Sequence, residues 1–144
     1  MLCLCIGLFL LVVAGFLLWA VFNPQQSVLR GASVNVQAAA DGFLDIPSSA
    51  AIEASKDVPV FLYMAACGHC TNAKAKMREA NTHRNVLTAS ATQEHFKTVA
   101  GMGGVPALIN NGELAHIGAS KALLDAVAAS SPKAAAKAFE KYKS

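Results

Sequence analysis

The pattern of hydrophobic positions changes after the first 22 residues. Residues 1–22 form one apolar run without a charged side chain, whereas polar residues divide the rest of the chain into short apolar stretches. At the rise of an α-helix, 22 residues span about 33 Å, and a bilayer's hydrocarbon core is about 30 Å thick. Trp19 and Phe22 lie where an interfacial aromatic belt is expected, and Asn23-Pro24 ends the helix. The run therefore predicts a transmembrane anchor.

A cleaved signal peptide is the competing interpretation of residues 1–22. Signal peptides carry a basic segment, a shorter apolar core and a small-residue cleavage site. This N-terminus has no Lys or Arg, and Trp19-Ala20 makes a poor cleavage site. We therefore expect a retained single span. Arg30 is the only basic residue near it, so the distribution of positive charge hardly favours either orientation.

The remaining chain divides into three expected segments. Residues 23–46 are expected to form a tether with a possible first strand, because short apolar stretches occur at 33–37 and 42–46. Residues 47–130 are expected to form the folded domain, which begins with a short helix led by proline. Residues 131–144 are basic and are expected to form a last helix or a tail. Such a segment is more often solvated than a surface for a membrane or a partner.

After residue 57 the periodicity predicts strand, helix, strand, helix, two strands and helix. The expected elements are a buried apolar strand at 58–64, a helix at 67–80, a second strand at 85–90 and a helix at 92–104. They are followed by a hairpin of strands at 106–109 and 114–117, joined through an Asn-Asn-Gly turn, and by a helix at 120–130. A strand–helix–strand unit followed by a hairpin and a helix gives a mixed sheet flanked by helices. The predicted fold class is therefore α/β.

Composition and cysteine usage narrow the functional classes. The 144 residues suit one domain with attachments, and the net charge is only +3. No basic stretch carries interleaved aromatic residues, so nucleic-acid binding has little support. Of the four cysteines, Cys3 and Cys5 fall in the apolar run, while Cys67 and Cys70 form one close pair. A structural disulfide framework would scatter its cysteines instead.

The position of the Cys-Gly-His-Cys motif indicates redox chemistry. Cys67 lies where a predicted strand ends and a predicted helix begins, so free backbone N–H groups and the helix dipole favour its thiolate. The thiolate is the nucleophile in disulfide exchange. With two residues between them, Cys70 can reach Cys67 within one helical turn and close a disulfide. We expect Cys67 to be the exposed attacking thiol and Cys70 the more buried resolving thiol.

The two residues inside the motif have expected roles of their own. An imidazolium at His69 would further stabilise the Cys67 thiolate and favour the reduced pair. Gly68 leaves room for a substrate chain to approach. No dissociable cofactor is needed for this chemistry, because the two cysteines carry the electrons themselves.

Three other interpretations of the pair are open. Cys67 and Cys70 can be structural cysteines that happen to lie close together. They can supply half of a zinc site, which needs two further ligands, but His83, His95 and His116 are not spaced as a pair. His95 is expected to be a polar helix residue and His116 an exposed hairpin residue. An iron–sulfur cluster shared across a dimer is the third interpretation.

A second motif, Gly103–Leu108, precedes the predicted hairpin. With the strand at 58–64 and the Cys-Gly-His-Cys motif, it makes the chain resemble the thioredoxin superfamily over roughly Val58–Ala128, about half its length. The resemblance implies that Pro106 follows a cis peptide bond and faces the cysteine pair. It also implies that Val105 offers its backbone to an extended substrate chain, with Gly104 in the same substrate-binding segment.

Some residues depart from the pattern of this family. The dipeptide of Cys-Gly-His-Cys is typical of protein disulfide isomerases, which implies an intermediate redox poise. Members often carry a tryptophan before the first cysteine, where this chain has Ala66, and a buried acid six residues before it, where this chain has Phe61. In this the chain is more similar to bacterial periplasmic disulfide isomerase and to membrane-tethered thioredoxin-like proteins. Its hairpin also resembles that of glutaredoxins.

These features predict a membrane-anchored thiol–disulfide oxidoreductase. The resemblance and the apolar run together predict a single-pass protein of the bacterial inner membrane, with its catalytic domain facing the periplasm. Its expected partners are protein thiols and disulfides of the envelope, and a membrane-bound or soluble redox partner. Oxidase, isomerase and reductase directions are all open. The alternative is a membrane-tethered binding module of an envelope complex, with no turnover.

Overall fold

The structure, a computed structural model, describes residues 42–144. The expected membrane span at 1–22, which includes Cys3 and Cys5, and the strand candidate at 33–37 lie outside the described residues. Within the described part, no helix has both the length and the apolar character needed to cross a bilayer.

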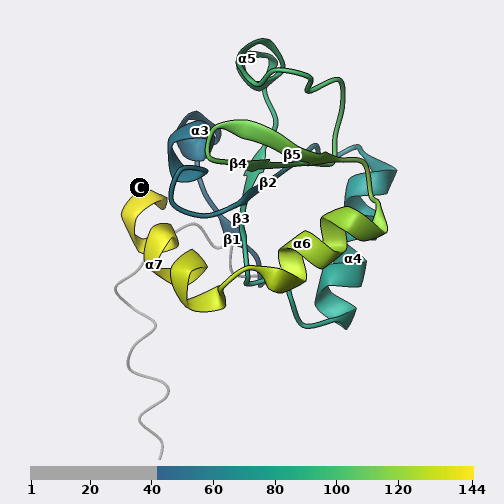
Figure 1. The fold of residues 1–144 in the computed structure, drawn as a ribbon, viewed down its shortest axis with the longest axis vertical. Helices are drawn as coiled ribbons and strands as arrows, with labels where there is room; N and C mark the ends of the chain where they lie inside the picture. The colour runs from purple at the N-terminus through teal and green to yellow at the C-terminus, as the bar shows by residue number, and fades with distance from the viewer. Residues whose placement is uncertain (1–41) are drawn as a thin grey trace, which may run out of the picture. The chain divides into compact units, whose positions relative to one another are not determined.

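A five-stranded mixed sheet forms the centre of this part of the chain (Figure 1). Its strands, in spatial order, are β1 (Leu44–Asp45), β3 (Leu87–Ser90), β2 (Val60–Tyr63), β4 (Ala107–Asn110) and β5 (Glu113–Ile117). The first three are parallel, while β4 runs antiparallel to both β2 and β5. The predicted mixed sheet and the predicted element order after residue 57 are confirmed.

Helices cover both faces of the sheet. They are η2 (Ser48–Ala50), α3 (Ala51–Ala54), α4 (Gly68–Glu79), α5 (Gln93–Thr98), α6 (Lys121–Ala129) and α7 (Pro132–Tyr142). Buried residues of α4 and α6 share one hydrophobic cluster, and those of α3 and α7 share another. The predicted α/β class is therefore correct for the described residues.

Strand β2 contributes to both clusters. Val60 and Leu62 belong to the cluster under α3 and α7, whereas Phe61 belongs to the cluster under α4 and α6. All three side chains are fully buried. A strand that is buried on both faces needs apolar residues at every position, which explains the continuous apolar run in the sequence. This strand leads directly into the Cys-Gly-His-Cys motif.

The helix expected at 92–104 is shorter in the structure. Helix α5 ends at Thr98, because Val99 adopts extended backbone angles and Gly101 has a φ of +79°. His95 lies in this helix, as expected, but its side chain is buried with 2% exposure. Its Nδ1 accepts the Thr92 backbone N–H at 2.9 Å, which leaves Nε2 to donate to the Ser48 carbonyl oxygen at 2.9 Å. His95 thus ties α5 to η2.

The hairpin turn is anchored by a buried serine. Asn111 and Gly112 both have positive φ, at 54° and 78°, as a tight two-residue hairpin turn requires. Ser55 is fully buried beneath this turn. Its hydroxyl oxygen accepts the Gly112 N–H at 2.9 Å, and its carbonyl oxygen accepts the Asn111 N–H at 2.6 Å. These bonds fix the end of the hairpin remote from Pro106.

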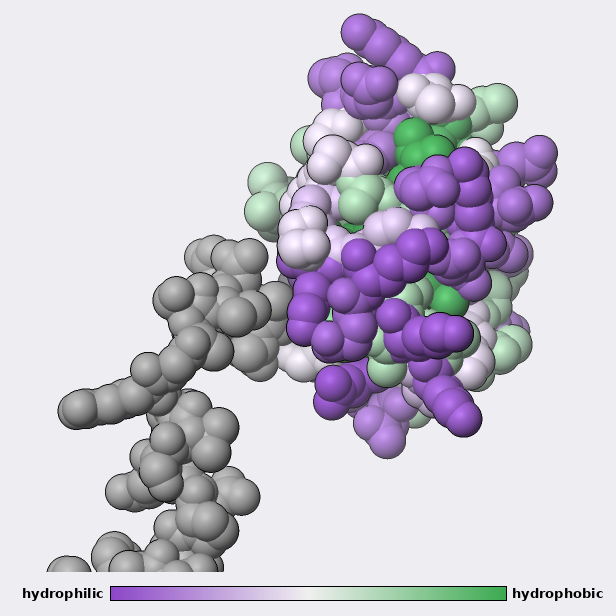
Figure 2. All heavy atoms as spheres, turned by 90° about the vertical axis from the view of Figure 1, so that its left-hand side faces the viewer, coloured by the Kyte–Doolittle hydropathy of each residue, from purple (hydrophilic) through white to green (hydrophobic). Residues whose placement is uncertain are grey.

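The C-terminal segment forms the packed helix α7. Ala135 and Ala138 are buried in the same cluster as β2 and α3, and the opposite side of α7 is charged. The face that carries α3 and α7 is largely hydrophilic (Figure 2). On it, the carboxylate of Asp57 accepts hydrogen bonds from Lys141 Nζ and from the Tyr142 hydroxyl, both at 2.9 Å. Residues 132–142 are therefore part of the folded domain.

The contacts of Asp57 give a pH-dependent prediction. Hydrogen bonds from Lys141 and, next, from Tyr142 lower the pKa of the Asp57 carboxyl. Because the pKa is lower in the folded chain, these contacts stabilise the fold at neutral pH, and the stabilisation is lost as pH falls through the lowered pKa. We expect Asp57→Asn to lower the melting temperature at neutral pH by a few degrees at most, and the difference from the parent to vanish in acid.

The matched control is Asp125→Asn. Asp125 is also exposed and paired, but its partner Lys121 lies one turn away in the same helix, α6. We expect thermal unfolding at neutral pH to show the larger loss for Asp57→Asn. An equal loss for the Asp57 variant at neutral and at acidic pH would contradict this account of α7.

Candidate functional site

The site is built on the turn between β2 and α4. Cys67 caps the N-terminus of α4 with extended backbone angles, and its Sγ accepts the backbone N–H of Cys70 at 3.1 Å. Its own N–H donates to the Met64 carbonyl oxygen at 3.1 Å, which closes the turn. The predicted position of Cys67, after a parallel strand and at the start of a helix, is confirmed.

Cys67 and Cys70 form a disulfide, with their Cα atoms 5.2 Å apart. Cys70 is only 1% exposed and faces the inner side of α4, along with Ala73 and Met77. Cys67 is partly exposed at the N-terminus of α4. Cys67 is therefore the more exposed residue of the pair and Cys70 the buried one, the order expected for an attacking and a resolving thiol.

The segment before β4 lies against this pair. The sulfur of Cys67 is 3.7 Å from the carbonyl oxygen of Val105, which is 38 residues further along the chain. The Val105-Pro106 peptide bond is cis, as the resemblance implied. Pro106 is buried, and its carbonyl oxygen accepts the Gly118 N–H at 2.7 Å. The structure thus brings Cys67, Cys70 and Val105 together.

Open space surrounds the glycines near the disulfide. A Cβ placed on Gly68, Gly103 or Gly104 would meet no atom within 4 Å, and none of the three has a positive φ. Neither packing nor backbone conformation requires glycine there. His69, the second residue of α4, is also exposed. The surface around Cys67 is therefore accessible to another chain.

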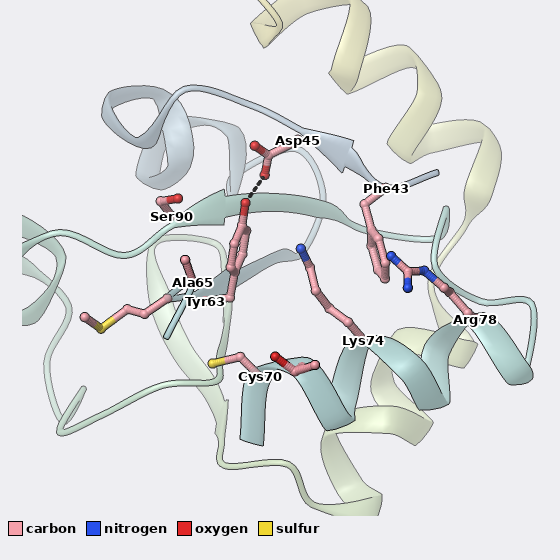
Figure 3. Close-up of a pocket in the computed structure, with 10 residues that line it drawn as sticks. Phe43, Asp45, Tyr63, Ala65, Cys70, Lys74, Arg78 and Ser90 are labelled. Carbon is pink, nitrogen blue, oxygen red and sulfur yellow. Dashed lines mark hydrogen bonds between the residues drawn. The ribbon is translucent and has the colours of Figure 1, made fainter. Parts of the chain in front are cut away.

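An open hollow of about 610 Å³ borders the pair on the side of Cys70. We call it the Cys70 hollow. It is lined by residues in and just before β1, at the end of β2 and in the turn after it, at the end of β3, and along α4. These residues are Phe43, Asp45, Tyr63, Met64, Ala65, Cys70, Thr71, Lys74, Arg78 and Ser90. Cys70 lies at its base, and Lys74 points into it between the rings of Tyr63 and Phe43 (Figure 3).

Two cations and one carboxylate line the Cys70 hollow. Lys74 Nζ lies 3.7 Å from the ring centroid of Tyr63, and the guanidinium carbon of Arg78 lies 5.1 Å from that of Phe43. Asp45 Oδ1 accepts the Tyr63 hydroxyl at 3.1 Å. None of these residues was expected from the sequence to be part of the site. A signal was present for the cations, because Cys70, Lys74 and Arg78 follow each other at four-residue spacing on one helix face.

The histidines considered as zinc ligands do not converge on the pair. His95 is occupied by Thr92 and Ser48, and His116 is half-buried on β5 rather than fully exposed. His83 packs edge-on against Phe43, with ring centroids 5.6 Å apart. Among residues 42–144, no three His, Cys, Asp or Glu side chains form a group that could hold a metal ion.

Comparison with protein-family models, with curated proteins and with solved structures finds no match to this chain. What the cysteine pair can do is therefore inferred from the chemistry of its own surroundings.

The unequal exposure of the two cysteines gives a labelling prediction. After reduction, we expect native protein to be alkylated by iodoacetamide at least about tenfold faster at Cys67 than at Cys70, because burial excludes the reagent and the helix end favours the Cys67 thiolate. Peptide mass spectrometry separates the two sites from Cys3 and Cys5. Unfolded protein, as the control, should react at similar rates at both sites. Equal rates in the native chain would contradict the assigned roles.

Proposed function

We propose that this chain is a thiol–disulfide oxidoreductase with a thioredoxin-like fold. The observation that carries the proposal is the geometry of Cys67. Its sulfur is disulfide-bonded to a buried cysteine, receives a backbone N–H at a helix N-terminus, and borders the Val105 carbonyl group on an open surface. A purely structural disulfide has no need of a partly exposed cysteine in such a position.

The first step is attack by the reduced pair on a substrate disulfide. The Cys67 thiolate forms a bond to one substrate sulfur, the substrate S–S bond breaks, and the other sulfur leaves as a thiolate that takes a proton from water. The N–H of Cys70, which points at Cys67 Sγ, and the positive end of α4 favour the attacking thiolate. The product is a mixed disulfide between Cys67 and the substrate.

The second step resolves the mixed disulfide. Cys70 loses its proton and attacks Cys67 Sγ, the Cys67–Cys70 bond forms, and the remaining substrate sulfur leaves as a thiolate. Two electrons have then passed from the pair to the substrate. A second dithiol must reduce the pair to restore it, and a substrate dithiol that does so is itself oxidised. The burial of Cys70 protects the resolving sulfur from other reagents.

The backbone around Val105 suits an extended substrate chain. Its carbonyl oxygen lies 3.7 Å from the sulfur that would carry the substrate, so a strand beside it can hydrogen-bond while covalently linked. Gly68 and Gly104 leave the space next to it open. We assign substrate positioning to Val105, Pro106 and these two glycines. His69, exposed one residue before Cys70, is the side chain placed to tune the pair.

The proposed location is the bacterial inner membrane, with the domain on the periplasmic side. Its support is the sequence of residues 1–22, which has the length and composition of a single span. A disulfide-exchanging domain also suits an oxidising compartment. Tethering there would restrict the enzyme to envelope proteins and to a redox partner in or near the membrane.

The proposal is tested by trapping the mixed disulfide. In cells that express the full-length chain with Cys70→Ser, we expect partner proteins linked to Cys67 that dithiothreitol releases. Cys67→Ser is the matched control and should trap none through the motif. In vitro, the parent chain in detergent should reduce a peptide disulfide with dithiothreitol as the second dithiol, and Cys67→Ser should lower the rate at least about 100-fold.

Two outcomes would overturn the proposal. One is the absence of both trapped partners and peptide turnover. The other is a partner protein that binds non-covalently to the parent chain and binds equally well to the double variant Cys67→Ser, Cys70→Ser. That result would instead favour a binding module.

A further inference from the structure

The lysines of α7 leave an excess of positive charge on the face that α3 and α7 cover. The acidic side chains of α3, of α7 and of the turn between α3 and β2 each have a lysine partner, in the pairs Glu53–Lys56, Glu140–Lys143 and Asp57–Lys141. Lys133 and Lys137 are also exposed, but within residues 42–144 neither of them forms an ion pair. After the three pairs cancel, two positive charges therefore remain.

These two lysines lie close together on a packed helix. Lys133 and Lys137 are four residues apart, so their side chains are neighbours on the surface of α7. The first turn of α7 holds no acidic residue that would offset them. The other side of the helix is fixed to the domain, because Ala135 and Ala138 are buried. The two charges are thus presented together by a rigid element.

The chain enters the domain beside α7. Strand β1 packs against α7, and its Leu44 lies in the same hydrophobic cluster as Ala135 and Ala138. Residues 1–22 have the length and composition of a membrane span, and only residues 23–41 separate them from the described domain. Even fully extended, that connection reaches at most about 65 Å. A span at 1–22 would therefore hold the domain close to a bilayer, with the chain entering it next to α7.

Two lysines suit a weak contact with anionic lipid. Near an anionic membrane surface, each lysine favours the bound state by about fivefold. Two such residues would not recruit a free domain to a membrane, but they are enough to orient a domain that its own chain already holds there. The attraction is screened beyond about 8 Å at physiological ionic strength, so α7 must lie against the headgroups to gain it.

We propose that Lys133 and Lys137 bind anionic phospholipid headgroups, so that the face carrying α7 lies on the bilayer. This inference rests on the proposed membrane location and adds a lipid contact to it. Helix α4, which begins after Cys67, packs on the opposite face of the sheet from α7 (Figure 1). In this orientation the exposed surface around Cys67 stays clear of the bilayer and open to a substrate chain.

The test uses the full-length chain in bilayer discs of phosphatidylcholine alone, or of an equimolar mixture with phosphatidylglycerol. Acetic anhydride acetylates exposed lysines, and peptide mass spectrometry gives the rate at each one. We expect Lys133 and Lys137 to react about three- to fivefold more slowly in the anionic discs, and added salt to remove the difference. Lys76, which is exposed on α4 and also unpaired within residues 42–144, should react at the same rate in both discs.

Lys133→Gln and Lys76→Gln form a matched pair of variants. Each removes one exposed positive charge from a helix surface and leaves the hydrophobic clusters unchanged. We expect Lys133→Gln to lower the protection of Lys137 in the anionic discs at least about twofold, and Lys76→Gln to leave it unchanged. Lys133→Arg keeps the charge and should keep the protection.

Each result decides the inference. Equal acetylation rates in the two kinds of disc, or equal protection of Lys76 and the two α7 lysines, would overturn it. The proposed thiol–disulfide exchange would still stand, because trapping at Cys67 and peptide reduction are measured without this contact. A chain that fails to enter the discs would remove the proposed membrane location, and the inference with it.

Discussion

The hydrogen bond from the Cys70 amide to the Cys67 sulfur caps helix α4 and, at the same time, contacts the atom that we propose to be reactive. The start of a helix leaves backbone N–H groups without partners, and Ser, Thr, Asp or Asn usually supplies the acceptor. In α4 the acceptor is the Cys67 sulfur itself. The group that caps the N-terminus of the helix and the group that we propose to exchange electrons are thus one atom. The same geometry that stabilises the first turn also favours negative charge on that sulfur.

The rest of the domain fixes where this atom lies. Because β2 is buried on both faces, the turn at Met64 cannot shift along the sheet without exposing apolar side chains. From the other direction, β4 is held between β2 and β5, and Ser55 fixes the far end of the hairpin. Val105 therefore approaches Cys67 at the end of a strand that is constrained along its whole length. Two independent parts of the fold meet at the sulfur.

Sequence reasoning succeeded where a local pattern determines structure. The continuous apolar run gave β2, and the Asn-Gly pair gave the hairpin turn, because buried strands and positive φ each demand particular residues. It failed where contacts between distant segments decide, as in the burial of His95, whose side chain reaches Ser48. It also placed the end of α5 too late, because Val99 leaves the helical conformation before the glycines that were expected to end the helix. The Cys70 hollow needs β1 beside α4, which no spacing within one segment reveals.

The glycines near Cys67 have a consequence for how such a protein can diverge. Gly68, Gly103 and Gly104 occupy backbone conformations open to other residues, and a side chain at any of them would point into unfilled space. Substitutions there change the exposed surface around Cys67 while leaving the hydrophobic clusters untouched. The domain can therefore vary the shape and chemistry of this surface at a few positions, with the cysteine pair and the packed core both preserved.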